Sequence, residues 1–206
     1  LAILGGSRWS EKAVRQFARF AERFDLPVAC SFRRQMLFDH LDPHYAGDVG
    51  IGLNPKLKAR IDESDLLLIV GGRMSEMPSQ GYTLLGIPET GKTLVHVHAD
   101  ADELGRVYRP TLAINASPAA FAGAAESLQP PHGEIAWSGW TRAAHADYRA
   151  WSETLPAIPG AAQTGAAIAH LRAVLPDDAI FCNGAGNFAT WVHRFWRFRR
   201  YATQAA

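Results

Sequence analysis

The stretch Asp65-Leu-Leu-Leu-Ile-Val-Gly-Gly-Arg73 decides the fold class of this chain. Its five consecutive apolar residues, 66–70, are typical of a strand covered on both faces, because a strand with one wet face alternates apolar and polar residues. Two glycines and an arginine follow the strand directly. Such a strand belongs to a parallel sheet, where ligands bind at the carboxyl ends of the strands.

Strands and helices alternate on both sides of this stretch. Further strands are expected at residues 1–4, 27–31, 93–98 and 112–114. The loops at the carboxyl ends of the strands are expected at residues 5–10, 32–54, 71–89 and 99–103. Helices are expected to begin after Ser10, at Asn54-Pro55 and at Ser117-Pro118, which are N-cap signals, and to run to about residues 24, 64 and 128. Alternation of this kind implies right-handed crossovers. Residues 1–128 are therefore predicted to form an α/β domain: a three-layer, doubly wound parallel sheet, Rossmann-like and of the NAD/FAD-binding-domain type.

The remainder of the chain looks like the beginning of a second α/β domain. Residues 129–160 are expected to form a linker, with two prolines and two glycines in residues 129–139, and a helix over residues 141–155. Residues 161–206 are expected to contain a helix over residues 164–175 and a strand over residues 179–182. That strand runs into the turn Phe181-Cys-Asn-Gly-Ala-Gly-Asn-Phe-Ala-Thr-Trp191. A strand, a glycine turn and a helix together can cradle a phosphate.

The composition is that of an ordinary globular protein. Of the 206 residues, 48% are apolar and 20% charged, and the net charge of +1 argues against nucleic acid as the main partner. No apolar run is long enough for a membrane span, and no signal peptide is visible. Both cysteines, Cys30 and Cys182, fall in strands expected to be buried. Two cysteines are too few for a disulfide framework, so we expect a cytoplasmic protein. The chain begins within a strand-like run at Leu1, without Met, so we expect residues upstream.

Four short patterns are candidate sites. Gly5-Gly6-Ser7 is either a nucleotide turn or a tight turn without ligand, since it is not a full G-x-G-x-x-G. Gly72 and Arg73 either bind a phosphate or form part of an ordinary surface loop. His96 and His98 share one face of a strand, and packing beneath a helix is favoured over metal ligation. Asp100, at the end of that strand, is a candidate partner for a ribose hydroxyl.

The C-terminal segment interleaves aromatic and basic residues. We favour a helix whose aromatic residues pack into a neighbouring domain or subunit over a nucleic-acid patch, because the rest of the chain is not basic. No nucleophile with a base beside it is recognisable. The residues themselves therefore predict binding functions, with no catalytic and no metal-binding residue.

The order of three motifs resembles a known family. A strand followed by Gly-Gly and a helix, then residues 65–73, then Val95-His-Val-His-Ala-Asp-Ala-Asp-Glu-Leu-Gly105 resemble the central domain of thiamine-diphosphate-dependent enzymes. The acetolactate synthase-like branch is the most similar. Residues 177–191 resemble the opening of the C-terminal cofactor domain of that family.

The resemblance implies a larger enzyme. Members of this enzyme family have three α/β domains, act as homodimers or homotetramers, and make or break C–C bonds beside the carbonyl of a 2-oxo acid. They use thiamine diphosphate and Mg²⁺. The activating Glu lies in the N-terminal domain and a Gly-Asp-Gly…Asn metal motif further into the C-terminal domain, and neither is in this chain. We therefore expect the N-terminal and C-terminal domains as partners, and no catalysis by these 206 residues alone.

The resemblance also carries over to particular residues. Gly184, Gly186 and Asn187 match the turn that approaches the cofactor diphosphate, and Gly72 and Arg73 match the Gly-x-Arg that meets FAD in the synthases. Some members bind FAD and others ADP in the central domain. Met-Ser-Glu-Met after Arg73 replaces the Phe-Asp-Asp-Arg of the synthases. A vestigial nucleotide site is therefore an alternative interpretation of this loop. Two other hypotheses compete with that of a thiamine-diphosphate-dependent enzyme. One is a non-catalytic FAD-, ADP- or NAD-binding module, and the other is a sirtuin-like or electron-transfer-flavoprotein-like domain.

Overall fold

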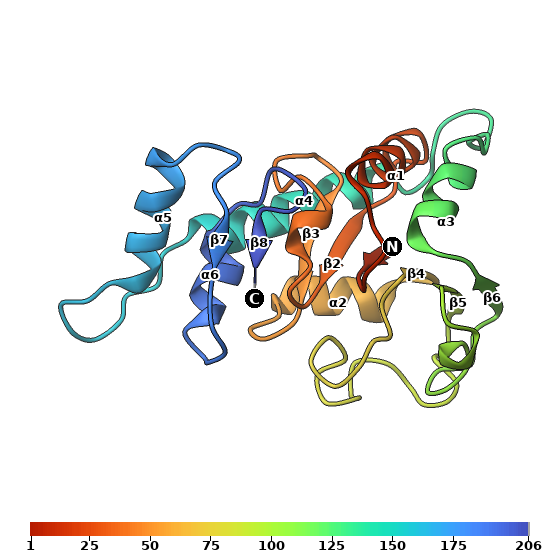
Figure 1. Cartoon of the computed structure of the whole chain (residues 1–206), viewed down its shortest axis with the longest axis horizontal. Coiled ribbons are helices and arrows are strands. Elements are labelled where there is room, and N and C mark those ends of the chain that lie inside the picture. Colours follow the sequence, from red (N-terminus) through yellow and green to blue (C-terminus); the bar gives the residue numbers. More distant parts are fainter. Residues whose placement is uncertain (206) are drawn as a thin grey trace.

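The computed structural model of the chain describes residues 1–205. Its main element is a parallel sheet of six strands in the order β3-β2-β1-β4-β5-β6. The order reverses between β1 and β4, which confirms the doubly wound sheet. Figure 1 shows this sheet in the middle of the molecule. The strands are β1 (Ala2–Leu4), β2 (Val28–Ser31), β3 (Tyr45–Val49), β4 (Leu66–Val70), β5 (Thr93–His98) and β6 (Leu112–Asn115).

The helices begin where the N-cap signals predict. The side-chain oxygens of Ser10, Asn54 and Ser117 accept hydrogen bonds from backbone N–H groups of the first turns. The α-helices are α1 (Glu11–Arg23), α2 (Pro55–Glu63), α3 (Pro118–Ala125), α4 (Ser138–Glu153), α5 (Thr164–Val174) and α6 (Ala189–Phe195). Two single turns of 3₁₀ helix, η1 (Gln35–Leu37) and η2 (Ala101–Glu103), follow β2 and β5.

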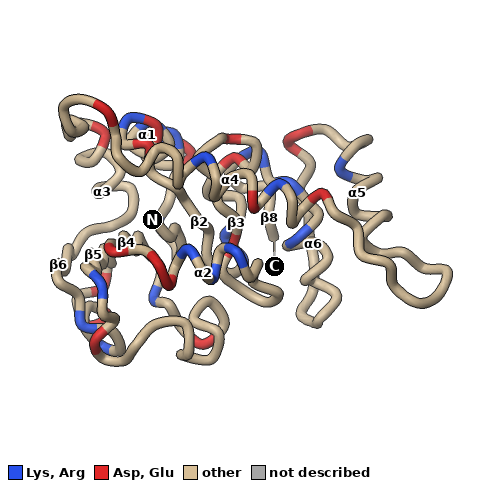
Figure 2. The backbone as a smooth tube through the Cα atoms, turned by 180° about the vertical axis from the view of Figure 1, so that it is seen from behind, with Lys and Arg blue, Asp and Glu red and all other residues tan. Residues whose placement is uncertain are grey.

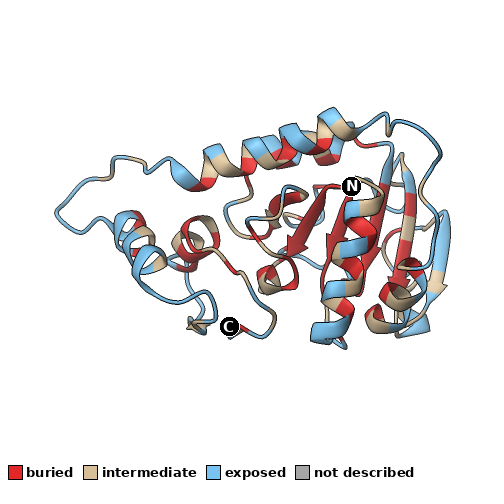
Figure 3. Ribbon diagram, turned by 90° about the horizontal axis from the view of Figure 1, so that it is seen from above, coloured by how far each residue is buried: buried red, intermediate tan, exposed pale blue. Residues whose placement is uncertain are grey.

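Alternate residues of the strands divide the core between two faces of the sheet. Leu4 and Val70 pack with Phe17 of α1 and Ala122 of α3. Their neighbours along the strands, among them Ile3 and Ile69, pack on the other face with residues of α2 and α4. Figure 3 shows the buried strands between helices whose outer surfaces are exposed. The central strands β1 and β4 are thus covered on both faces, which confirms the three-layer arrangement predicted from residues 66–70.

Residues 32–54, expected to be a loop, contain strand β3. Tyr45 is fully buried, with its ring stacked 4.1 Å from that of His40 and edge-on to Tyr148 of α4 at 4.7 Å. The strand carries Gly47 and Asp48, residues of low β propensity, so its sequence shows no strand pattern. Burial beneath α4 stabilises a strand that local preference does not predict.

Helix α4 joins the two parts of the chain. It packs along β3 and α2, where Nε of Arg60 donates to Asp147 over 3.0 Å. Near its other end, the carbonyl oxygen of Trp151 accepts a hydrogen bond from Arg194 over 2.9 Å, and the guanidinium of Arg194 lies 3.7 Å from the Trp151 ring.

The C-terminal part forms a small unit beside β3. It consists of α5, α6 and a two-stranded parallel sheet of β7 (Phe181–Cys182) and β8 (Gln204–Ala205) (Figure 1). Phe195, Trp196 and Phe198 are buried in a cluster of this unit, against which Met36 of the six-stranded domain also packs. The Phe198 ring lies edge-on to the ring of His40 at 5.6 Å, so this aromatic residue packs against the neighbouring domain of the same chain. Cys182 is exposed, so the expectation that both cysteines are buried was wrong for one of them.

Basic and acidic residues are mixed over the surface. Figure 2 shows both signs along α1, α2 and α4. Within residues 1–205, no helix is long and apolar enough to cross a membrane.

Candidate functional site

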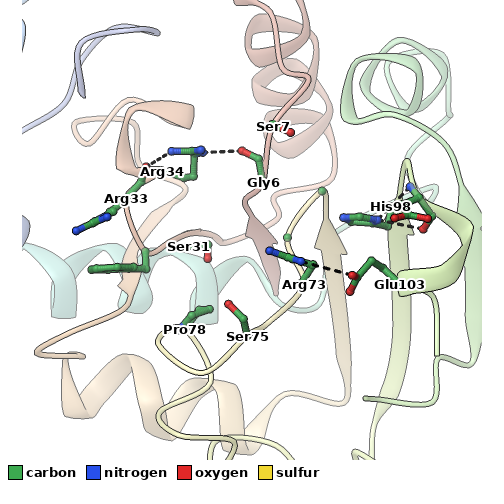
Figure 4. A pocket seen from close by; sticks show the side chains of 14 residues that line it. Gly6, Ser7, Ser31, Arg33, Arg34, Arg73, Ser75, Pro78, His98 and Glu103 are labelled. Atoms are coloured by element: carbon green, nitrogen blue, oxygen red, sulfur yellow. Dashed lines mark hydrogen bonds and ion pairs between the residues drawn. The ribbon is translucent and has the colours of Figure 1, made fainter. Parts of the chain in front are cut away.

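A crevice of about 490 Å³ opens at the carboxyl ends of the central strands. It lies where the strand order reverses, the position at which open α/β sheets bind ligands, and its volume is within the range of small-molecule sites. Figure 4 shows its lining. The lining residues come from the loops after β1, β2, β4 and β5: Gly6, Ser7, Ser31, Phe32, Arg33, Arg34, Gly71, Gly72, Arg73, Ser75, Pro78, His98, Asp100 and Glu103.

Two glycine turns in contact form the floor of the crevice. The N–H of Gly5 donates to Val70 over 2.9 Å, and the N–H of Gly71 donates to Val97 over 2.8 Å, so each turn continues the ladder of the sheet. Gly6 has a φ of +69°, and a Cβ placed on it would lie 1.8 Å from the carbonyl oxygen of Gly71. The close approach of the two turns therefore requires glycine, and it leaves backbone exposed to a ligand.

The β2 end of the crevice is basic. Nε of Arg34 donates to the carbonyl oxygen of Gly6 over 2.6 Å, and its Nη1 donates to that of Arg33 over 2.7 Å (Figure 4). These two bonds hold the Arg34 guanidinium in place without using up its donors. The guanidinium carbon of Arg33 lies 5.0 Å from the centre of the Phe32 ring, which is cation–π range.

The β4 and β5 ends are of mixed charge. Arg73 is exposed and lies 3.5 Å from the carboxylate of Glu103, which also meets Arg106 at 3.0 Å. Nδ1 of His98 accepts a hydrogen bond from the backbone N–H of Asp100 over 3.1 Å. The Asp100 side chain accepts from the N–H of Asp102 and caps η2. Its second carboxylate oxygen is free to accept from a ligand hydroxyl.

The two histidines of β5 have different surroundings. His96 is buried, and its Nε2–H donates to the carbonyl oxygen of Gly72 over 2.9 Å, which fixes the turn after β4. Burial lowers the pKa of His96, so the ring is neutral at pH 7. His98 instead lines the crevice. Within residues 1–205 no group of three His, Cys, Asp or Glu side chains is placed to hold a metal ion.

The sequence also matches a known family of domains. The family model described as "Thiamine pyrophosphate enzyme, central domain" matches residues 1–124, more than half of the chain. The chain belongs to the thiamine pyrophosphate enzyme family. No curated protein matches it. The family membership predicted from the motifs is thus confirmed, and the cofactor of the family is thiamine diphosphate.

The structure separates the site residues predicted from the thiamine-enzyme resemblance into two groups. Gly72 and Arg73 line the crevice at the switch point. Gly184, Gly186 and Asn187 do not line it; they are exposed in the turn between β7 and α6. Thr190, one turn further along, lies near the loop after β3, since its side-chain atoms would be 3.6 Å from a Cβ placed on Gly52.

The turn before α6 fits the diphosphate of the family cofactor in one respect. Within the part of the chain that the structure describes, the backbone N–H groups of residues 184–188 have no acceptor, so they can donate to an anion. Gly186 has a φ of +149°, which favours glycine, and a Cβ there would lie 2.7 Å from the ring of the exposed Phe188. The described residues supply no metal-ligand cluster for a cation bound to that diphosphate.

Sequence reasoning missed the basic β2 end of this thiamine-enzyme domain. Arg33 and Arg34 were included only in a long loop expected after the second strand, without a role. A signal was present, because two adjacent arginines directly after a buried strand stand at the carboxyl edge of the sheet. Only the strand order shows that they lie next to Gly6 and across from Arg73.

Proposed function

We propose that this chain serves as the nucleotide-binding central domain, with the start of the cofactor domain, of a thiamine-diphosphate-dependent enzyme. The enzyme would be a decarboxylase or carboligase acting on a 2-oxo acid, in the manner of acetolactate synthase. The observation that carries the proposal is the place of Gly72 and Arg73 in the crevice at the switch point of the sheet. These residues match the Gly-x-Arg that meets FAD in the synthases.

In this proposal the crevice binds the ADP portion of a nucleotide, either FAD or ADP. The backbone of the two glycine turns and the guanidinium of Arg73 would hold the diphosphate, since arginine meets phosphate through charge-assisted hydrogen bonds. Asp100 would accept a hydrogen bond from a hydroxyl group of the nucleotide. Glu103 competes with the phosphate for Arg73, at the long distance of 3.5 Å.

Thiamine diphosphate, when bound, supplies a ring that stabilises a carbanion formed from the 2-oxo acid. Gly184, Gly186 and Asn187 would hold its diphosphate through backbone N–H groups. Mg²⁺ ligands and the activating Glu would come from the N-terminal and C-terminal domains of the enzyme, in a homodimer or homotetramer. The family model supports this division, since it describes a central domain.

A second function, a non-catalytic nucleotide-binding module, has one observation in its favour. The crevice at the switch point is complete within this chain, with backbone donors, cations and a carboxylate all present. The turn before α6, by contrast, has no group of three His, Cys, Asp or Glu side chains placed to hold a metal ion, among residues 1–205. The two functions share the nucleotide site and differ in whether the parent protein performs chemistry.

Nucleotide binding is tested on the chain itself. Purified protein is examined for flavin absorbance, and ADP and FAD are titrated into it by calorimetry. Arg73→Ala should weaken binding by about 1–3 kcal/mol, the cost of losing a charge-assisted hydrogen bond. Arg142→Ala, which removes an exposed arginine from α4, is the matched control and should leave binding unchanged. Absence of binding by both nucleotides would contradict the proposal.

The enzymatic part needs the gene product that contains all three domains. Pyruvate consumption is measured with thiamine diphosphate and Mg²⁺ added, and other 2-oxo acids are tried in turn. Activity that depends on both additions would support the decarboxylase or carboligase. If the gene product binds nucleotide but consumes none of the 2-oxo acids tested, the result would favour the non-catalytic module instead.

A further inference from the structure

The β2 end of the crevice carries two arginines that no carboxylate neutralises. Within residues 1–205, neither Arg33 nor Arg34 lies within 4.0 Å of a carboxylate, whereas Arg73 and Arg106 both meet Glu103. Two adjacent cations on a concave surface repel one another. An anion bound between them relieves that repulsion.

Within residues 1–205, the side chain packed behind Phe32 supplies no counter-charge to the two arginines. Behind Phe32 lies His193, whose ring is edge-on to the Phe32 ring at 5.5 Å. Both ring nitrogens of His193 are buried without a partner in the described residues. Burial, together with the charge of Arg33, lowers the pKa of His193 to about 4, so this ring is neutral at pH 7. The positive charge of the arginines therefore remains available to a ligand.

The two arginines are also prepared for binding before a ligand arrives. Arg34 is fixed by the carbonyl oxygens of Gly6 and Arg33, and Arg33 is stacked on Phe32. A positioned guanidinium loses less conformational entropy on meeting a phosphate than a free one. Arg33 also has a φ of +59°, an uncommon backbone conformation for a residue with a side chain.

The position of these arginines indicates which part of a nucleotide they meet. In doubly wound sheets the group after the second strand reads the ribose: a carboxylate accepts from a free hydroxyl, and an arginine accommodates a ribose phosphate. Here the arginines follow β2, and the carboxylates of Asp100 and Glu103 stand across the switch point after β5. The charge changes sign along the crevice, from Arg33 and Arg34 to Asp100.

We propose that Arg33 and Arg34 bind a phosphate on the ribose of the nucleotide, so that the crevice selects an adenosine diphosphate phosphorylated at the 2′ or 3′ position over ADP itself. The proposal rests on the nucleotide site proposed above. It adds a ligand class, since neither FAD nor ADP carries a phosphate at the 2′ or 3′ position of the ribose.

The test compares three ligands on the chain by titration calorimetry at one salt concentration. The ligands are ADP, 2′-phospho-ADP and 3′-phospho-ADP. One of the two phosphorylated forms should bind about tenfold more tightly than ADP, or better, as expected for new charge-assisted hydrogen bonds. Which of the two binds better distinguishes the 2′ from the 3′ position.

Variants assign the preference to the two arginines. In Arg33→Ala, and separately in Arg34→Ala, the ratio of the dissociation constants for ADP and the preferred ligand should fall toward one. Arg33→Lys should keep part of the ratio, since lysine retains the positive charge but lacks the paired N–H donors of a guanidinium. Arg142→Ala should keep the full ratio. Circular dichroism of each variant establishes that it is folded.

Three outcomes would overturn the proposal, and they separate it from the nucleotide site. Equal affinity of the unaltered chain for ADP and both phosphorylated forms would refute the ribose-phosphate proposal and leave the nucleotide site standing. No binding of any of the three at millimolar concentration would refute both. A preference that survives in both alanine variants would show that the phosphate is read elsewhere.

Discussion

Nε of Arg34 donates a hydrogen bond to the carbonyl oxygen of Gly6 over 2.6 Å, between residues 28 positions apart. The bond joins the end of β2 to the turn after β1. Gly6 in turn lies against the carbonyl group of Gly71 after β4. Three strand ends are therefore held together before any ligand binds, and the crevice is largely preformed.

The contact between the two glycine turns predicts a severe effect of Gly6→Ala. The new Cβ would lie 1.8 Å from the carbonyl oxygen of Gly71, and the φ of +69° would also be strained. We expect the free energy of unfolding to fall by about 3 kcal/mol or more. Gly81→Ala is the control, because Gly81 has a φ of +67° and open space around it. It should cost only about 1 kcal/mol in urea denaturation; equal losses would mean that backbone strain alone is responsible.

Glu103→Gln should strengthen nucleotide binding. The carboxylate lies 3.5 Å from Arg73 and repels a diphosphate that approaches the same guanidinium. Surface ion pairs are weak, so we expect the dissociation constant for ADP to fall only about threefold. Glu11→Gln, which breaks the exposed pair with Arg15, should leave it unchanged. Weaker binding by Glu103→Gln would instead assign Glu103 to the ligand as a hydrogen-bond acceptor.

The buried His193 predicts a loss of stability in acid. Burial and the charge of Arg33 lower its pKa from 6.5 to about 4. Between these values the unfolded chain binds a proton that the folded chain does not, so stability conferred by the neutral ring is lost as pH falls from about 6.5 to 4. His193→Leu should reduce the slope of unfolding free energy against pH by up to about 1.4 kcal/mol per pH unit.

The measurement for His193 is urea denaturation at several pH values across that window. The exposed His132→Leu serves as the matched control and should keep the original slope. His40 is fully buried, and burial lowers its pKa to about 3, so it contributes a slope of the same sign in every variant. Identical slopes for His193→Leu and the unaltered chain would show that His193 is protonated in the folded protein.

The two cysteines should differ sharply in reactivity. Cys30 is fully buried in β2, where burial raises the pKa of its thiol, and Cys182 is exposed in β7. A thiol reagent should therefore label one cysteine rapidly in the native chain and both in denaturant. Cys182→Ser should remove the rapid phase and Cys30→Ser should retain it. Rapid labelling of both in the native chain would show that β2 opens readily.

Part of the candidate site was predictable because its residues follow recognisable strands. Gly72 and Arg73 stand directly after the apolar run of β4, so their place at the carboxyl edge of the sheet follows from the sequence alone. Arg33 and Arg34 stand after β2 in the same way, yet their importance depends on neighbours from other loops. The bond from Arg34 to Gly6 and the lack of a carboxylate partner are properties of the assembled sheet.

The sequence by itself determined the layers, the helix starts and the glycine turns of this protein. Leu66–Val70 requires cover on both faces, and Ser10, Asn54 and Ser117 cap the helices that follow them, because these preferences act over a few residues. Only the tertiary structure decided that Tyr45 lies in a strand, since its burial depends on Tyr148, 103 positions away. It also decided the charge pattern of the crevice, because strand order, a long-range property, sets which loop ends meet.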